Sequence, residues 1–198
     1  MISEELLAKY GASEKRLIKN ELLFSAGQPA SYYYQVKSGK IKMNNYNEEG
    51  REFIQRIFET GQSFGEPPLL GEWDYPANAV SVTDCTLWRL TRPKFITLLF
   101  ENPQAHLDLT KHICERLYYK ATIAAEMSTN GPEHRIMTLL SYVKKHVHGV
   151  GDDSAIKIDL TRQQIGDLCG LRVETAIRTI KKLEVQGKLS IKNRKVFI

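Results

Sequence analysis

Residues 159–191, DLTRQQIGDLCGLRVETAIRTIKKLEVQGKLSI, constrain the fold most, because two helical patterns flank a single glycine there. Thr161 is followed three residues later by Gln164, which is the spacing of a capping box that starts a helix. Gly170 predicts the turn that ends it. The second helix is expected to bury one side, formed by Val173, Ala176, Ile177, Ile180 and Leu183. Two short helices joined by a tight turn indicate a helix-turn-helix.

The other side of the second helix carries groups suited to the edges of DNA bases. Arg178 can donate two hydrogen bonds to guanine, Glu174 can accept from the cytosine amino group, and Val173 can meet a thymine methyl. The candidate DNA-binding residues are Thr161, Arg162, Gln163, Arg172, Val173, Glu174, Thr175, Arg178 and Lys181. The alternative is an ordinary amphipathic helix pair with a solvated charged face. The cap, the turn glycine and the basic hairpin that follows favour DNA binding.

That hairpin is predicted from residues 189–191 and 195–198, which flank Lys192, Asn193 and Arg194 as a wing. Residues 156–198 hold ten Lys and Arg and four Asp and Glu, a net charge of +6. Since the whole chain carries +5, the first 155 residues carry −1. The C-terminal part therefore has the charge expected of a nucleic-acid partner, although a basic membrane-facing surface would give the same sum.

Residues 17–92 indicate an antiparallel β-domain, a sandwich or a barrel. Short alternating segments rich in Tyr, Val, Ile and Phe are separated by Gly27, Gly39, Gly50, Gly61 and Gly65. The clearest expected strands are 32–36, 40–44, 52–58 and 80–90. Thr91 and Pro93 then open a short helix, where a proline suits the first turn.

Residues 106–128 predict one long helix with two apolar stripes. A seam with alternating spacings of three and four contains Leu107, Thr110, Cys114, Leu117, Ala121, Ala124 and Ser128. A neighbouring stripe of Ile113, Leu117, Ala124 and Met127 could pack on the helix's own sheet domain. The seam favours dimerisation, and a helix packed only within its own chain remains the alternative.

Residues 130–132, Asn-Gly-Pro, end this helix, and Pro132 suits the first turn of the next one. The next helix is expected to bury Ile136, Leu139, Leu140, Val143 and Val147. A polar loop at 148–155 leads into a short strand at 156–160 and the helix pair. The expected domains are residues 1–104, 105–130 and 131–198.

No catalytic or metal-binding constellation is evident. Cys85, Cys114 and Cys169 lie far apart without metal-ligand spacing, so buried reduced thiols are expected. Five histidines are expected to be solvated or capping groups: His106, His112, His134, His146 and His148. The chain lacks a Ser/His/Asp set and a P-loop, so neither an enzyme nor a cofactor is expected. With no signal peptide and no apolar run of ~20 residues, a cytoplasmic protein is expected.

These parts in this order resemble the Crp–Fnr family of bacterial transcription regulators. The resemblance is carried by LLFSAGQPASYYYQVKSGKIKM at 22–43, ETGQSFGE at 59–66, LTRQQIGDLCGL at 160–171 and VETAIR at 173–178. VETAIR looks closer to the oxygen-responsive branch than to the cyclic-AMP branch. The resemblance implies an α+β fold with an N-terminal antiparallel β-roll of the cyclic-nucleotide-binding type. A long dimerisation helix and a C-terminal winged helix-turn-helix would follow.

The function that the resemblance implies is a homodimeric, sequence-specific DNA-binding transcription regulator. The implied partners are a palindromic operator of double-stranded DNA, a second copy of the chain and RNA polymerase, with a small-molecule effector as a further possibility and no membrane. Two recognition helices about 34 Å apart would read successive major grooves. The alternative is a cyclic-nucleotide-binding signalling module without a specific DNA site.

The sequence departs from the family where cyclic nucleotides bind. In relatives that bind them, a Gly-Glu pair is followed roughly ten residues later by Arg-Ser or Arg-Thr. Gly65 and Glu66 are present here, but Tyr75-Pro76-Ala77-Asn78 occupies the Arg-Ser region. Without the arginine, the anionic phosphate lacks a bidentate partner.

The long helix also departs from the family pattern for cyclic-nucleotide binding, because Lys120-Ala121 stands where the cyclic-AMP branch has Thr-Ser. Cyclic AMP is therefore not the expected effector, and Gly65, Glu66 and Lys120 are the remaining candidates for effector binding. The N-terminal cysteine cluster of the oxygen-sensing branch is absent, since the first cysteine is Cys85. The histidine positions give no support for a haem site.

Overall fold

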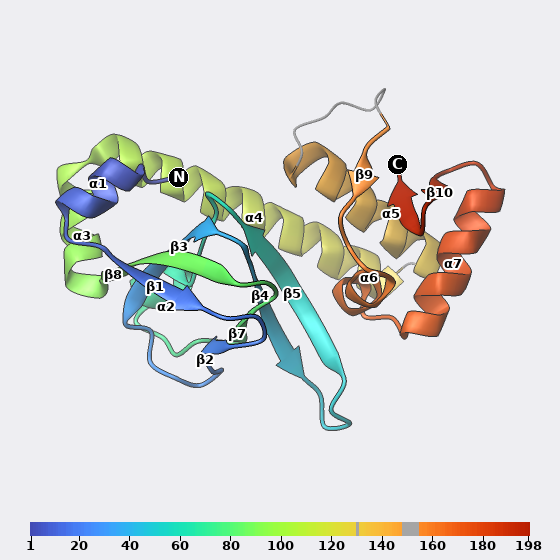
Figure 1. Cartoon of the computed structure of the whole chain (residues 1–198), viewed down its shortest axis with the longest axis horizontal. Coiled ribbons are helices and arrows are strands. Elements are labelled where there is room, and N and C mark those ends of the chain that lie inside the picture. The colour runs from blue at the N-terminus through green and yellow to red at the C-terminus, as the bar shows by residue number, and fades with distance from the viewer. Residues whose placement is uncertain (130, 148–154) are drawn as a thin grey trace. The chain divides into compact units, whose positions relative to one another are not determined.

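The computed structural model describes residues 1–129, 131–147 and 155–198. The chain forms two compact units, Met1–Glu115 and Arg116–Ile198, and each is described by itself (Figure 1). The boundary between them falls inside the long helix α4, Pro103–Thr129. Among the described helices, none combines the length and the apolar character needed to cross a membrane.

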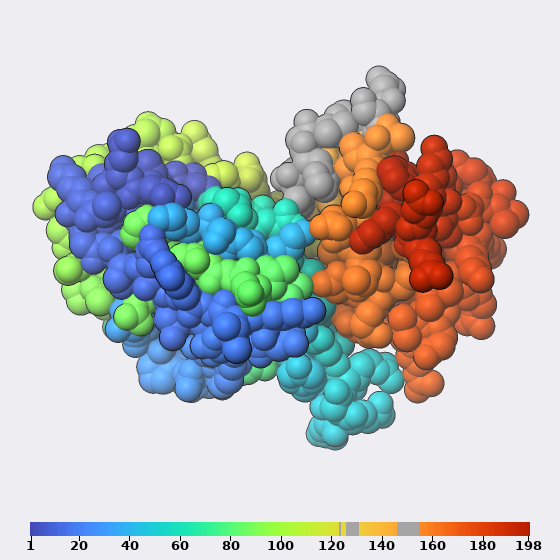
Figure 2. All heavy atoms as spheres, viewed as in Figure 1, coloured from blue at the N-terminus to red at the C-terminus, as the bar shows by residue number. Residues whose placement is uncertain are grey.

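The first unit is an antiparallel β-roll, as expected from the sequence. One sheet has the strand order β1-β8-β3-β6 and the other has the order β2-β7-β4-β5. The strands are β1 Ser13–Leu17, β2 Leu22–Phe24, β3 Tyr32–Ser38, β4 Lys40–Tyr46, β5 Glu52–Glu59, β6 Ser63–Phe64, β7 Asn78–Ser81 and β8 Cys85–Thr91. The turn that joins β4 and β5 protrudes from this unit (Figure 2).

The continuous strand expected at 80–90 is wrong, because β7 ends at Ser81 and β8 begins at Cys85 in the other sheet. The turn between them is held by side chains. Thr83 Oγ1 accepts the backbone N–H of Lys40 at 3.0 Å, and Asp84 Oδ1 accepts that of Lys19 at 2.8 Å. Apolar residues alternate at Val80 and Val82 and again at Cys85 and Leu87, and the shift of phase at Asp84 coincides with the change of sheet.

Three helices complete the first unit, α1 Glu4–Lys9, α2 Glu66–Gly71 and α3 Arg92–Glu101. With α4 they build a second apolar cluster outside the roll, which includes Tyr33, Leu90, Phe95, Leu98 and Leu109. The rings of Tyr33 and Phe95 stack in it at a centroid distance of 4.5 Å. This cluster fixes the first turns of α4 to the roll.

The stripe of α4 that meets its own sheet domain differs from the one expected. Ile113 packs against the cluster, as the sequence suggested, and Leu109 is buried there too. Leu117 and Ala124 are exposed, because the cluster receives only the part of α4 up to Ile113. The side chain of Met127 lies outside the described residues.

The second unit is a winged helix-turn-helix. Its elements are α5 Pro132–Tyr142, a π-helical turn η1 Val143–Val147, β9 Lys157–Ile158, α6 Arg162–Cys169, α7 Val173–Val185, β10 Ser190–Lys192 and β11 Lys195–Phe197. The strands form an antiparallel sheet in the order β10-β11-β9. The expected stripe of α5 is buried at Ile136, Leu139 and Leu140. The side chain of Val147 and the loop residues 148–154 lie outside the described residues.

The thiols are free but not uniformly buried. Cys85 and Cys169 are buried as expected, and burial raises their pKa to about 11 and about 12. Cys114 is exposed, so the expectation of a buried thiol is wrong there. It lies on the seam of α4, away from the side that carries Leu109 into the apolar cluster.

Candidate DNA-binding site

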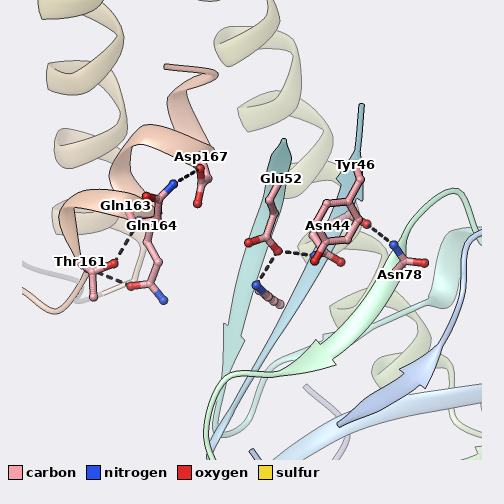
Figure 3. A network of polar contacts seen from close by, with 9 residues as sticks. Asn44, Tyr46, Glu52, Asn78, Thr161, Gln163, Gln164 and Asp167 are labelled. Atoms are coloured by element: carbon pink, nitrogen blue, oxygen red, sulfur yellow. Dashed lines mark hydrogen bonds and ion pairs between the residues drawn. The ribbon is translucent and has the colours of Figure 1, made fainter. Parts of the chain in front are cut away.

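The first helix of the pair, α6, begins at the capping box that the sequence predicts. The backbone N–H of Gln164 donates to Thr161 Oγ1 at 3.1 Å, and the backbone N–H of Thr161 donates to Gln164 Oε1 at 2.9 Å (Figure 3). Gln163 Nε2 donates to Oδ1 of the buried Asp167 at 2.8 Å. These bonds fix the start of α6, which in a helix-turn-helix lies over the DNA backbone.

The turn between α6 and α7 requires two glycines. Gly170 ends α6 with φ 64°, a left-handed conformation that favours glycine. At Gly166, a Cβ atom would lie 3.0 Å from the carbonyl oxygen of Leu171 and 3.6 Å from Cβ of Ala176. The backbone N–H of Leu171 donates to the Gly166 carbonyl at 2.8 Å. The absence of a side chain at Gly166 therefore lets α7 pack closely on α6.

The two faces of α7 are divided differently from the sequence prediction. The buried side contains Ala176, Thr179, Ile180 and Leu183. Ile177 was expected on that side, but it is 38% exposed. At about 100° per residue, Ile177 lies roughly 110° from the middle of the buried set. Hydrophobicity placed Ile177 in the core, and the helical geometry instead brings Thr179, which was not among the expected residues, to the buried side.

Polar residues occupy the exposed face of α7 and its start. Arg172, Glu174, Arg178 and Lys181 are all exposed, while Val173 and Thr175 are half-buried. Arg172 is the N-cap residue of α7, with φ −65° and ψ 144°, and its side chain makes no capping hydrogen bond. The helix thus presents a carboxylate and several cations outward.

The structure separates cations held by the protein from cations that are not. Lys182 Nζ lies 2.5 Å from Glu133 Oε1 on α5, and this hydrogen bond lowers the pKa of the Glu133 carboxyl. Lys195 Nζ lies 3.5 Å from Asp159 Oδ1. Within the described ranges, the cations without an ion pair include Arg172, Arg178, Lys181, Lys188 and Arg194. These charges are available to phosphates.

Arg162 differs from the other candidate cations. Burial lowers the pKa of its guanidinium, and the Glu184 carboxylate acts in the opposite direction. Glu184 Oε1 also accepts the backbone N–H of Ile191 at 2.9 Å, which ties α7 to the first wing strand. Arg162 therefore lies partly within the unit, close to this connection.

The wing is a tight hairpin on the surface of the second unit (Figure 2). Asn193 and Arg194 at its tip have φ values of 49° and 62°. Positive φ at both central residues is the geometry of a type I′ turn, which matches the twist of the strands. Both tip residues are exposed, so the wing presents Arg194 to solvent.

One effector candidate of the β-roll, Gly65, lies against an aromatic residue. Gly65 has φ 80° and precedes α2, and Ser63 Oγ donates a hydrogen bond to the buried carboxylate of Glu66. A Cβ at Gly65 would lie 3.4 Å from Cε1 of Tyr75. The Tyr75 ring is buried and stacks on Phe24 at a centroid distance of 3.6 Å. The segment that lacks Arg-Ser thus places an aromatic ring against the Gly65 turn.

The backbone holds Tyr75 in this position. Its N–H donates to the Gln28 carbonyl at 2.8 Å, and its carbonyl accepts the N–H of Gly27, also at 2.8 Å. Burial raises the pKa of the Tyr75 phenol. Lys120, the remaining effector candidate, is exposed on α4 in the part that belongs to the second unit.

A polar network lies on the second sheet of the roll (Figure 3). Glu52 on β5 accepts a hydrogen bond from Asn44 Nδ2 and lies 2.5 Å from Lys42 Nζ on β4. Asn78 Nδ2 donates to the Asn44 carbonyl at 3.3 Å, which connects β7 to β4. The charges of Glu52 and Lys42 thereby compensate each other within the sheet.

A β-roll followed by a winged helix-turn-helix with unpaired cations defines a class of DNA-binding regulator. Comparisons with known proteins agree. The cyclic nucleotide-binding domain family matches residues 14–102, and the Crp-like helix-turn-helix domain family matches residues 134–198. The chain belongs to the Crp–Fnr family of transcription regulators.

Individual relatives cover nearly the whole chain. The cAMP-activated global transcriptional regulator CRP of Haemophilus influenzae is 27% identical over 177 residues, 89% of this chain and 79% of that protein. The structure of the c-di-GMP responsive global regulator CLP of Xanthomonas campestris has a TM-score of 0.77 at 23% identity and covers 98% of this chain and 95% of that one. A CooA mutant from Carboxydothermus hydrogenoformans has a TM-score of 0.80 at 18% identity, covering 100% and 87%.

The uncapped start of α7 gives a testable expectation. Arg172→Ser should raise the melting temperature of the free protein and weaken DNA binding. Serine adds a cap that stabilises the helix by about 0.5–2 kcal/mol. It also removes a cation whose presence at the positive end of the helix dipole destabilises the helix by roughly 0.3–1 kcal/mol. Thermal unfolding and DNA titration at physiological salt measure the two effects.

Arg172→Ala is the matched control, because it removes the charge without adding the cap. Its DNA affinity should fall as in the serine variant, while its melting temperature should stay closer to that of the wild type. A serine variant that binds DNA as tightly as the wild type would show that Arg172 is only a surface residue.

Proposed function

We propose that this protein is a homodimeric regulator that binds a palindromic DNA operator sequence-specifically and controls transcription together with RNA polymerase. The observation that carries this proposal is the exposed face of α7, where Glu174, Arg178 and Lys181 stand together and the two cations have no ion-pair partner in the described chain. Such a face combines base-reading groups with groups that neutralise phosphates. Residues 1–104 would form the sensor, 105–130 the dimer helix and 131–198 the DNA-binding domain.

Different residues of this face have different roles in the proposal. Glu174 and Arg178 read base edges, while Lys181, Thr175, Arg162 and Gln163 contact the DNA backbone. Thr161 belongs to the same backbone-facing helix start, and Val173 lies at the edge of the base-reading set. The free cation of the wing, Arg194, adds to the positive field around the duplex.

The seam of α4 supports the homodimer. Its described apolar members are exposed, including Leu107 at 50% and Leu117 at 66%. Exposed apolar residues at alternating spacings of three and four fit a second helix of the same kind. A two-fold axis would bring each seam residue next to its own copy. The dimer would also place two α7 helices about 34 Å apart, one turn of DNA.

The proposed effector of the roll is a molecule other than cyclic AMP. Alternatively, the roll has lost control by any ligand. Relatives of this fold are named for cAMP and for c-di-GMP, so the fold does not fix the ligand. In this chain Tyr75 packs against the Gly65 turn, and Ala77 of the same segment is buried. Neither side chain carries the positive charge with which an arginine pairs with a phosphate. The candidate ligand groups are Gly65, Glu66 and Lys120.

The roles on α7 are tested by three alanine variants. Arg178→Ala should cost about 1–3 kcal/mol on the cognate site and relax the preference for guanine. Lys181→Ala should weaken binding to all sequences alike. It should also lower, by about one, the magnitude of the slope of the logarithm of the binding constant against the logarithm of the salt concentration. Lys182→Ala is the control and should leave the slope unchanged, because Lys182 is paired with Glu133. Equal losses on cognate and random DNA for Arg178→Ala would contradict the assignment.

The same titrations separate the proposal from its alternative, a signalling module without a specific DNA site. The regulator should bind the selected operator at least ~10³-fold more tightly than random duplex at one salt concentration. The signalling module should bind both duplexes equally and weakly. Sites selected from random DNA provide the operator.

The dimer is tested through Cys114. Because Cys85 and Cys169 are buried with raised pKa values, a short bis-maleimide should react chiefly at Cys114 near neutral pH. If the seam joins two copies, the reagent should produce a covalent dimer in high yield at micromolar protein. Cys114→Ser should abolish the product. The homodimer is wrong if the protein sediments as a monomer and the reagent forms no cross-linked product.

Cyclic-nucleotide binding is tested by titration calorimetry. Cyclic AMP and cyclic GMP should give no saturable heat up to about 1 mM, which corresponds to a binding free energy of roughly −4 kcal/mol. Micromolar binding that disappears in Glu66→Gln, with the fold intact by circular dichroism, would restore cyclic-nucleotide control.

A further inference from the structure

An exposed isoleucine stands within the polar face of α7. Ile177 is 38% exposed and neighbours Arg178 in sequence. It lies three residues after Glu174 and four before Lys181, spacings that place side chains side by side on a helix. A β-branched residue has only modest helix propensity. Part of Ile177 packs on the unit, and the rest of its apolar surface is open to solvent.

The DNA major groove offers one apolar feature, the C5-methyl group of thymine. We propose that Ile177 is a specificity-determining residue that contacts a thymine methyl in the operator half-site. This inference rests on the proposed function, because it requires α7 to enter the major groove. Ile177 would add an apolar contact to a face whose other residues form hydrogen bonds with bases or ionic contacts with phosphates.

The spacing along α7 fixes where this thymine should be. Side chains three or four residues apart on a helix are about 5–6 Å apart, and successive base pairs rise by about 3.4 Å. The thymine contacted by Ile177 therefore lies within about two base pairs of the pair read by Arg178 or Glu174. The half-site should combine a guanine or cytosine contact with a nearby thymine.

Val173 is less suited to the same role. It is half-buried, and its Cα lies 3.6 Å from the position that a Cβ at Gly166 would occupy. The start of α7 thus packs against α6 at Val173. Ile177 stands one turn further along the helix, where the cations and Glu174 are exposed.

Deoxyuridine substitution tests this contact, because it removes the thymine methyl and leaves base pairing unchanged. Each thymine of an operator selected with the wild-type protein is replaced in turn. One replacement within about two base pairs of the Arg178-dependent position should weaken wild-type binding about 3- to 10-fold. Ile177→Ala should weaken binding to the thymine site by a similar factor, and it should show no further loss at the deoxyuridine site.

Val185→Ala is the matched control, since Val185 is an apolar residue of α7 that is 89% exposed. This variant should keep the full deoxyuridine effect. The proposal is overturned if no replacement affects wild-type binding, or if the effect is equally large in Ile177→Ala. Failure of the wild-type protein to select any site would instead overturn the proposed function, and this inference with it.

Discussion

The DNA-binding unit depends on the close approach of α7 to α6. Gly166 provides the space, since a Cβ there would lie 3.0 Å from the Leu171 carbonyl oxygen. Gly170 provides the left-handed turn. Together they allow Ala176 and Ile180 to be fully buried, which fixes the rotation of α7 about its axis. That rotation decides which side chains are exposed, so the chemistry of the exposed face follows from two glycines that carry no side chain.

Local signals in the sequence predicted the elements well, because the interactions behind them are local. The capping box joins residues three apart, and the β-roll strands and the wing follow alternation and turn residues. The exposure of Ile177 and the burial of Thr179 depend on the angle at which α7 packs on its neighbours, which hydrophobicity does not encode. The exposure of Leu117 and Cys114 depends on where along α4 the apolar cluster with Leu109 ends.

The apolar core of the roll reaches the segment in which the sequence lacks the Arg-Ser pair. Phe24, Tyr34, Phe64 and Tyr75 lie in the same apolar cluster between the sheets. The stack of Tyr75 on Phe24 makes residues 75–78 contribute an aromatic ring to this core. Burial of a large aromatic side chain stabilises the roll, whereas a buried arginine requires an anion as partner. Because Tyr75 carries no charge, its burial in this core requires no anion as a partner.

The helix α4 takes part in the packing of both units. Its Leu109 is buried in the apolar cluster of the first unit, and its Tyr119 stacks on Tyr142 of α5 at a centroid distance of 3.5 Å in the second. The exposed seam lies along the same helix. Within the second unit, α5 is in turn paired with α7 through Glu133 and Lys182. The packing that supports α7 therefore includes side chains of both α4 and α5.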